Sequence, residues 1–370
     1  KPITVEIATR TGKLQAKVWD TRNILTFDGD QSGQRFEYGD LTDDQKQKLG
    51  SDLNDGSVAD VIAENTANYI RGKDLNSNAN RSIMLGDIVH SSPVFIDDVV
   101  YVGANDGMLH AFNAIDGTEI FGYVPFLVFD HLKDLADQDA GHQFYGDVSP
   151  AVQNGAGLPG GAGERAILVG GLGKGGLGYF ALDITHPDSM DDDQVLWEFP
   201  RQDTLPDDVL DMGYSYSKPV VVQSYSAASW IVIAGNGYSS PNGNSVLFIL
   251  NAANGAVIRK LVAGTGPDNG LSSPIAVDVD FDDKVDFVYA GDLKGNLWKF
   301  DLTSDNSDEW DVAFKEGSTA APLFTALDRD GNPQPITAKP DVMLHPEMHG
   351  YIVCFGTGKF LGSSDFDDAR

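Results

Sequence analysis

VYVGANDGMLHAFN, residues 100–113, and VYAGDLKGNLWKFD, residues 288–301, align along their whole length without a gap. Each stretch is a β-rich run, a turn that contains glycine and a second β-rich run, which is the pattern of a β-hairpin. Two hairpins of one plan, so far apart in a single chain, indicate a fold that is built from a repeated unit.

Looser copies of the hairpin occur elsewhere in the chain. Their strands are expected at 167–170 with 179–183 and at 230–235 with 246–251, and a fifth copy begins at 351–360. A proline stands at the expected strand entry of each copy, namely Pro93, Pro150, Pro219, Pro274 and Pro340. These prolines are roughly 60 residues apart, a spacing that suits one four-stranded blade with its loops.

One blade cannot bury both of its faces, so the simplest architecture for this repeat is the radial stacking of several blades. We therefore expect an all-β fold, a β-propeller, with its blades in residues 91–370. Five blades are recognisable, and residues 1–90 complete the ring or pack on it. A sandwich of two sheets is the alternative, but it does not explain why the copies keep the same Gly and Asp or Asn positions.

Residues 1–90 are expected to be partly helical. Thr42 is a suitable N-cap with Gln45 three residues later, while Ser57 opens a second helix that Gly72 closes. Apolar residues recur at helical spacing in this second segment, at Val58, Val61, Ile62 and Tyr69.

The formal net charge of −29 favours cations and basic protein surfaces as partners. It argues against nucleic acids and anionic membranes, which attract clustered Lys and Arg. No stretch approaches the roughly 18–20 apolar residues of a membrane span, so membrane insertion is not expected.

Cys354 is the single cysteine and lies in an apolar run, where a buried thiol is expected. Because the chain opens on Lys1 and not on Met, we expect it to be part of a longer protein.

Two short motifs suggest other chemistry but lack the context it needs. The run 171–176 matches a dinucleotide-binding glycine pattern, yet strand-like residues follow it where a helix N-terminus should be, so a glycine-rich hairpin is expected. His345, Glu347 and His349 contain the residues of a zinc site. Pro346 disfavours the helix that would place both histidines on one face, so a hairpin tip is expected there too.

The most specific chemical signal is the acidic run at 278–286. Carboxylates stand at its positions 1, 3, 5 and 9, and the carbonyl at position 7 comes from a lysine, which is the ligand spacing of a calcium-binding loop. The expected ligands are the side chains of Asp278, Asp280, Asp282 and Asp286 and the main-chain carbonyl of Lys284.

This run departs from an EF-hand in three ways. Asp283 replaces the glycine of position 6, and Tyr289 stands at position 12 in place of the bidentate glutamate. Strands flank the loop where an EF-hand has helices, so Asp286 is the expected bidentate ligand. The alternative is a solvated acidic hairpin that binds no ion, but alternating carboxylates between two apolar strands repel one another without a cation.

Four ordered blocks carry a family resemblance: LGDIVHSSP at 85–93, VGGLG at 169–173 with YFALD at 179–183, YAGDLKGNLWKFD at 289–301, and FGTGKFL at 355–361. With these blocks the chain resembles the C-terminal domain of the PilY/PilC family, the type IV pilus assembly factors and tip adhesins. The resemblance covers nearly all of the chain.

The resemblance implies a modified seven-bladed propeller with quinoprotein-like blades and a calcium loop at the five positions named above. It implies a non-catalytic domain in which calcium regulates pilus extension against retraction, with roles in twitching motility, adhesion and virulence. The implied partners are pilins or minor pilins and the host-cell surface. The implied location is the bacterial cell surface, at the pilus tip or outer membrane, after export through the periplasm. Arg71 and Gly72 are followed by Lys73, so the integrin motif of some family members is absent.

The alternative function is that of a quinoprotein-type dehydrogenase, because the repeat also resembles blades that hold pyrroloquinoline quinone and calcium on a propeller axis. Those enzymes commonly use adjacent cysteines near the cofactor, whereas Cys354 stands alone. The expected calcium ligands are also sequential in one loop, so we do not expect an enzyme.

Overall fold

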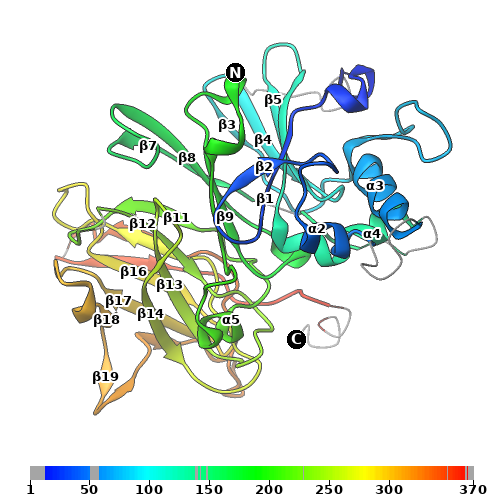
Figure 1. Ribbon diagram of the computed structural model, residues 1–370. Helices are drawn as coiled ribbons and strands as arrows, with labels where there is room; N and C mark the ends of the chain where they lie inside the picture. Colours follow the sequence, from blue (N-terminus) through cyan, green and yellow to red (C-terminus); the bar gives the residue numbers. More distant parts are fainter. Residues whose placement is uncertain are drawn as a thin grey trace. The chain divides into compact units, whose positions relative to one another are not determined.

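The computed structural model describes residues 13–50, 58–137, 141, 143–146, 149–227, 229–347, 349–362 and 365. The chain forms two compact units, Lys1–Thr204 and Leu205–Arg370, and β-strands dominate both (Figure 1). Among the described residues, no helix has the length and apolar character needed to cross a membrane.

The first unit contains two sheets. The larger has the order β2-β1-β6-β5-β4-β3, and the smaller is the meander β10-β9-β8-β7. The strands are β1 (Ile24–Phe27), β2 (Gly33–Arg35), β3 (Val94–Ile96), β4 (Val99–Ala104), β5 (Met108–Asn113), β6 (Glu119–Val124), β7 (Ala151–Ala156), β8 (Glu164–Gly171), β9 (Tyr179–Asp183) and β10 (Val195–Phe199). Since β1 pairs with β6 in parallel, the N-terminal strands extend the sheet of the first repeat. The boundary at residue 90 stays a prediction.

The second unit contains the meander β11-β12-β13-β14 and the sheet β15-β16-β17-β18, in which β21 also pairs with β17. Two-stranded sheets join β19 to β20 and β22 to β23. The strands are β11 (Val220–Gln223), β12 (Trp230–Gly235), β13 (Ser245–Asn251), β14 (Val257–Gly264), β15 (Ile275–Val277), β16 (Phe287–Gly291), β17 (Asn296–Asp301), β18 (Asp311–Val312), β19 (Lys315–Glu316), β20 (Thr319–Ala320), β21 (Phe324–Thr325), β22 (Asp341–Leu344) and β23 (Tyr351–Cys354).

The repeat expected from the sequence is confirmed at the level of single residue pairs. Val100 lies opposite Phe112 in the β4–β5 hairpin, and Val288 lies opposite Phe300 in the β16–β17 hairpin, so the aligned residues have the same register. All five prolines stand one residue before a strand, at the entries of β3, β7, β11, β15 and β22. The mainly β architecture is therefore confirmed, while the count of seven blades stays a prediction.

The N-terminal helices are confirmed, with one difference. The helix α2 (Asp43–Lys48) starts with the expected capping box of Thr42 and Gln45. The helix α3 (Val58–Arg71) stops before Gly72, whose φ is +111°; Ser57 lies outside the described residues. The apolar residues that indicated α3 do not form its buried face, because Val58, Val61 and Ile62 are exposed. The buried residues are Ala59, Ala63, Thr66, Ala67, Ile70 and Arg71.

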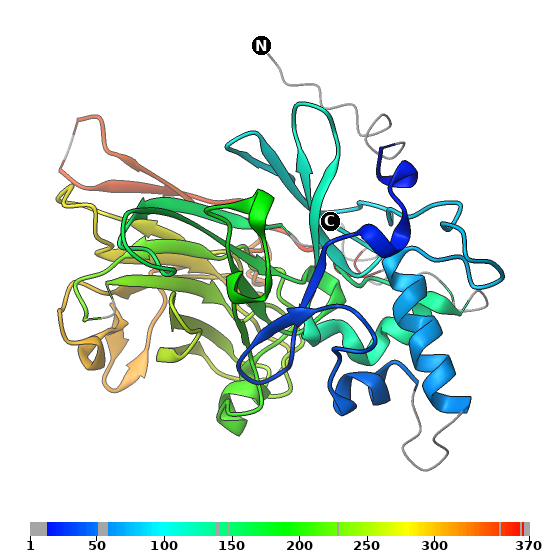
Figure 2. The ribbon, with the colours of Figure 1, turned by 45° about the horizontal axis from the view of Figure 1, so that its top comes forward.

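The helices α4 (Phe129–Ala136) and α5 (Pro206–Asp211) were not predicted. The helices α2, α3 and α4 pack on one another in the first unit (Figure 2). Single 3₁₀ turns are η1 (Trp19–Thr21), η2 (Phe126–Val128), η3 (Gly173–Gly175), η4 (Pro187–Ser189), η5 (Asp192–Gln194) and η6 (Ser307–Glu309).

Each unit has its own core. Both sheets of the first unit contribute to one cluster, for example Phe121 from β6 and Phe180 from β9, which are fully buried. In the second unit Ile249 from β13 and Phe300 from β17 belong to another cluster. The prediction of a buried Cys354 is wrong: the thiol is exposed, because a two-stranded sheet such as β22–β23 cannot cover both of its faces.

The two motifs that lacked context are confirmed as turns. The glycine run 171–176 joins β8 to β9 in an antiparallel hairpin, with η3 in the connection. His345 and His349 lie in the connection between β22 and β23. Among the described residues, neither motif has the α-helix that dinucleotide or zinc binding would need.

Candidate metal site

The acidic run is the connection between two paired strands. β15 and β16 are antiparallel, and their last pair is Val277 with Phe287. The backbone N–H of Asp286 donates to the carbonyl of Val277 at 3.0 Å, which closes the loop at its base. The first and last predicted ligands are therefore brought next to each other by the hairpin itself.

Asp278 organises the loop from its first position. Its Oδ1 accepts hydrogen bonds from the backbone N–H groups of Asp280, Phe281 and Asp282 at 3.2, 2.6 and 3.3 Å. Its Oδ2 accepts from the N–H of Asp283 at 2.8 Å. Such a set of bonds folds the backbone around one carboxylate and turns the following side chains toward a common centre.

Two residues of the loop have left-handed backbone conformations. Asp283 has φ +69°, as expected for the residue that replaces the glycine of an EF-hand, and aspartate tolerates this region better than most residues. Phe281 also has a positive φ, +64°, and its side chain is 76% exposed. An exposed phenylalanine in a left-handed conformation is unfavourable, so the loop holds local strain at this point.

Three of the predicted ligands converge. Asp278, Asp280 and Asp286 each offer a carboxylate oxygen, and these oxygens lie within 4.8 Å of one another. Two oxygens that bind one calcium ion at roughly 2.4 Å can be at most about 4.8 Å apart, so this separation fits a shared ion. Asp286 is buried: its Oδ2 accepts from the N–H of Val279 at 2.7 Å, and its Oδ1 accepts from the hydroxyl of Tyr225 at 3.3 Å.

The other two predicted ligands interact with each other. Asp282 accepts from the backbone N–H of Lys284 at 3.0 Å, and its second oxygen lies 3.3 Å from the Lys284 ammonium. That ammonium also lies over the ring of Tyr225, 4.6 Å from its centre. Asp282 is thus outside the group of three carboxylates, and its role as a ligand stays a prediction, as does that of the Lys284 carbonyl.

The electrostatics of the loop favour a cation. Local desolvation, and then the negative charges of Asp282, Asp286 and Asp278, raise the pKa of Asp280. Desolvation opposes the ionisation of Asp282 as well, but hydrogen bonds from Lys284 and Tyr225 lower its pKa. Asp280 accepts a hydrogen bond from the backbone N–H of Asp282, but this bond does not outweigh desolvation and the three neighbouring negative charges. A bound cation would remove that repulsion.

Two tyrosines at the site were not predicted. Tyr225 lies between β11 and β12, and Tyr351 is the first residue of β23, where its hydroxyl donates to the carbonyl of Val279 at 3.2 Å. Both are far from the loop in sequence, and no local pattern marks either of them. Only the folded second unit brings them to the loop.

The comparisons with known proteins all point to one protein family. The family model described as PilY1 beta-propeller domain matches residues 71–370. The type IV pilus biogenesis factor PilY1 of Pseudomonas aeruginosa is 36% identical over 416 residues, which cover 95% of this chain and 35% of that protein. A PilY1 homolog of Xylella fastidiosa is 44% identical over 278 residues, 72% of this chain and 18% of that protein. The chain spans about a third of the length of the former and less of the latter.

A solved structure is also similar. The crystal structure of the Pseudomonas aeruginosa PilY1 C-terminal domain superposes with a TM-score of 0.60 and 41% sequence identity. The match covers 72% of this chain and 54% of that one.

Proposed function

The chain belongs to the PilY1 β-propeller domain family, and from this premise we propose that it is a non-catalytic, calcium-binding domain of a type IV pilus biogenesis factor. The observation that carries the calcium part is the group of three carboxylates, Asp278, Asp280 and Asp286, held by one hairpin loop. The names of the relatives support the pilus part.

The proposal includes a seven-bladed propeller in which the sheets of four or more strands are blades. The equal registers of β4–β5 and β16–β17 support a repeated blade, and so do the prolines at the five strand entries. Quinoprotein-like blades are the form that we expect for these units.

In the proposed calcium complex, Asp278, Asp280 and Asp286 supply carboxylate oxygens, while Asp282 and the carbonyl of Lys284 complete the coordination. A hard cation of this kind takes roughly six to eight oxygens, so water or a bidentate Asp286 would supply the rest. Binding requires Asp282 to exchange the Lys284 ammonium for the ion, which changes the conformation at the tip of the hairpin.

That exchange gives calcium a way to act as a regulator. Occupancy would relieve the repulsion on Asp280 and fix the loop between β15 and β16, whereas loss of the ion would release it. We propose that the two states favour pilus extension and retraction differently, with consequences for twitching motility, adhesion and virulence. The partners in this proposal are pilins or minor pilins and the host-cell surface, at the pilus tip or outer membrane.

A quinoprotein-type dehydrogenase is the less supported function. The relatives are named as pilus biogenesis factors, and the candidate ligands belong to a single loop. Addition of pyrroloquinoline quinone and calcium to the purified chain, followed by absorption spectroscopy, tests this alternative. A bound quinone band with dehydrogenase activity would replace our proposal.

Calcium binding is tested by titration calorimetry and by the melting temperature with and without the ion. We expect Asp280→Asn to weaken calcium binding about tenfold or more, because it removes one of the converging charges. The amide oxygen of asparagine can still accept the hydrogen bond from the backbone N–H of Asp282. Asp286→Ala should abolish binding, but it also removes the acceptor for Val279 and so lowers stability by itself.

Asp283→Asn is the matched control, since it removes one charge from the same loop and asparagine tolerates the left-handed conformation. If calcium is bound by direct ligation, this variant should leave the calcium affinity within about a factor of three, because the lost charge is not a ligand. Equal weakening by Asp280→Asn and Asp283→Asn would contradict ligation. For the regulatory part, the same variants are placed in the full-length protein; normal piliation and motility with calcium binding lost would refute it.

A further inference from the structure

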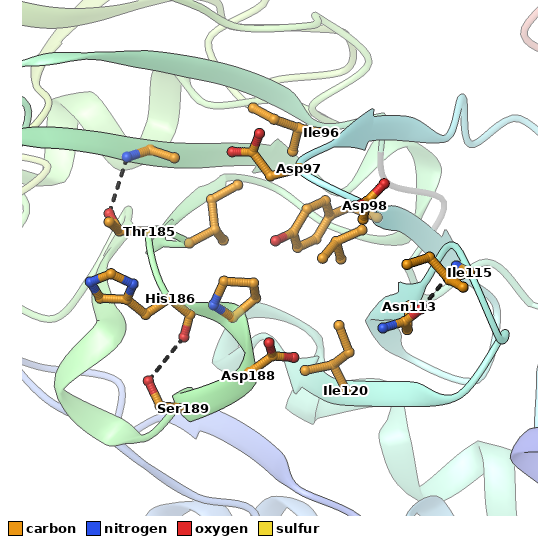
Figure 3. A pocket seen from close by; sticks show the side chains of 15 residues that line it. Ile96, Asp97, Asp98, Asn113, Ile115, Ile120, Thr185, His186, Asp188 and Ser189 are labelled. Atoms are coloured by element: carbon orange, nitrogen blue, oxygen red, sulfur yellow. Dashed lines mark hydrogen bonds between the residues drawn. The ribbon is translucent and has the colours of Figure 1, made fainter.

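A second candidate site lies in the first unit, apart from the acidic loop. It is a cavity of about 550 Å³ between the two sheets of that unit (Figure 3). Its lining comes from the β3–β4 hairpin, the β5–β6 turn, Ala166 of β8 and the segment from β9 to η4. A cavity of this size holds a small ligand or one long side chain.

The inner wall of the cavity is apolar. Val99, Ala166 and Ile184 are buried, and Ile96 and Ile120 are half-buried beside them. An alkyl chain that entered the cavity would therefore exchange water for apolar contacts, which is favourable.

The rim of the cavity is acidic. Asp97 and Asp98 occupy the β3–β4 turn, and Asp188 lies in η4 on a different loop, as Figure 3 shows. Within the part of the chain that the structure describes, none of these three carboxylates has a hydrogen-bond or ion-pair partner. The backbone of the turn explains the aspartates at positions 97 and 98, because both have positive φ values, 46° and 61°, which aspartate tolerates. The backbone gives no such explanation for the aspartate at position 188.

A polar group stands among these residues without a partner. Tyr101 lines the cavity and is only 1% exposed, yet its hydroxyl has no hydrogen-bond partner among the described residues. Burial, and then the negative charges of Asp97 and Asp188, raise the pKa of Tyr101, so both carboxylates act on the phenol. The hydroxyl oxygen itself keeps contact with the space of the cavity, so a ligand that entered could take the place of water as its hydrogen-bond partner.

A metal ion is not the ligand that this geometry suits. The group of converging acidic ligands found among the described residues is Asp278, Asp280 and Asp286, and the carboxylates of the cavity do not form a second one. They are spread around a larger space, which suits an organic cation with a body of its own.

We propose that this cavity binds a primary alkylammonium group, with the alkyl chain on the apolar wall and the ammonium between Asp97, Asp188 and the oxygen of Tyr101. An ammonium has three donors and no acceptor, and these are three separate acceptors. The ligand is either the lysine side chain of a basic protein segment or a free alkylamine. The net charge of −29 favours the approach of either.

The test is a calorimetric titration of the whole chain, in saturating calcium, with n-pentylamine, with n-pentanol and with N-acetyl-lysine methylamide. We expect saturable binding of an amine and at least tenfold weaker binding of the alcohol, which has the same chain without the charge. Preference for the lysine derivative assigns the site to protein ligands, and preference for pentylamine assigns it to free amines; either outcome supports the proposal.

Variants locate the binding. Asp97→Asn with Asp188→Asn should weaken amine binding about tenfold or more, and Tyr101→Phe about threefold to tenfold. The control is Asp305→Asn with Asp330→Asn, which removes the same charge from two exposed positions outside the cavity. The proposal is overturned by the absence of saturable amine binding, by an equal loss in the control, or by pentanol binding as tightly as pentylamine. Because calcium is saturating throughout, these outcomes do not depend on the acidic loop.

Discussion

The β4–β5 and β16–β17 hairpins share a backbone but not a polar interior. Their registers are equal, and both turns have a glycine with positive φ, Gly107 at 88° and Gly295 at 78°. The third residue after each glycine is buried and contacts a buried aspartate, but it is His110 in one hairpin and Trp298 in the other. The repeat therefore determines where a polar group is buried, and the unit in which it lies determines how that group is satisfied.

In the first hairpin the polar interior is ionic. His110 lies between Asp106, 3.0 Å from Nε2, and Glu119, 2.9 Å from Nδ1. Glu119 accepts two hydrogen bonds from Arg22 at 2.8 and 2.7 Å. All four side chains are buried, so two positive and two negative charges balance away from water. Such a group is stable only while it is complete.

In the second hairpin the polar interior has one charge and neutral donors. Asp292 is fully buried and accepts from the indole N–H of Trp298 at 2.8 Å and from the amides of Asn269 and Asn296 at 3.0 and 3.1 Å. Backbone N–H groups bind its other oxygen. None of the described residues that bind Asp292 is a histidine, so this interior has no imidazole like that of the first hairpin.

The largest difference should follow from removing a charge in the first hairpin. Arg22→Met leaves Glu119 with His110 as its remaining ion-pair partner and leaves excess negative charge in this buried group. We expect a loss of about 3–5 kcal/mol in the free energy of unfolding, the cost of breaking a buried ion pair by removing one partner. Urea denaturation of the whole chain, with hydrogen exchange of residues 99–124, measures it.

Arg35→Met is the control, because Arg35 is exposed on β2 and the substitution is the same. It should change stability by less than about 0.5 kcal/mol. If both variants unfold at the same urea concentration, the ionic interior does not stabilise this unit and the contrast between the hairpins fails.

A second difference should appear in the pH dependence. Burial opposes protonation of His110, but the charge of Asp106 and hydrogen bonds to Asp106 and Glu119 outweigh it and raise the pKa of His110 to about 9. The folded state therefore binds this proton more tightly than the unfolded state, in which the pKa is about 6.5. The stabilisation is complete below pH 6.5, falls between pH 6.5 and 9, and is lost above about 9.

The expected loss over this range is on the order of 2–3 kcal/mol. It should appear in hydrogen exchange of β4–β6 measured from pH 7 to 9, and β16–β17 should change much less. His110→Gln should flatten the dependence in β4–β6 while Trp298→Phe leaves it unaltered. An equal decline in the two hairpins would mean that general charge repulsion causes it.

The features that could be predicted from the sequence are those that depend on short segments of the chain. The hairpins, the strand entries after proline and the capping box at Thr42 are properties of short segments, and each was predicted. The ionic interior was not, because Arg22 joins a hairpin that begins nearly eighty residues later, and only the parallel pairing of β1 with β6 brings it there.

In the candidate metal site, too, the residues of one short segment could be predicted and those from distant segments could not. The aspartates of one loop could be identified by their spacing, whereas Tyr225 and Tyr351 come from other strands and could not. The cavity at Tyr101 combines three loops, none of which has a motif of its own. A helix such as α3 was predicted correctly, but its buried face was not, because the small residues Ala63 and Ala67 pack closely where larger apolar residues would not fit.

The smallest effect concerns the two glycines that define the shared turn. Both have left-handed conformations, so substitution by alanine costs about 1 kcal/mol at either position. The added Cβ meets different neighbours. At Gly107 it would lie 2.8 Å from Cδ2 of Leu132, the end of a flexible side chain, whereas at Gly295 it would lie 2.7 and 2.9 Å from the backbone oxygens of Gln334 and Ala326.

Because a side chain can move and hydrogen-bonded backbone cannot without disturbing its partners, Gly295→Ala should destabilise the chain by about 1 kcal/mol more than Gly107→Ala. Thermal and urea unfolding of the two variants measure this difference directly. Equal losses would indicate that the turn conformation alone sets the cost, so that the two repeats are equivalent in packing as well as in backbone. A larger loss at Gly107 would mean that Leu132 is held as rigidly as a backbone atom by the packing of α4.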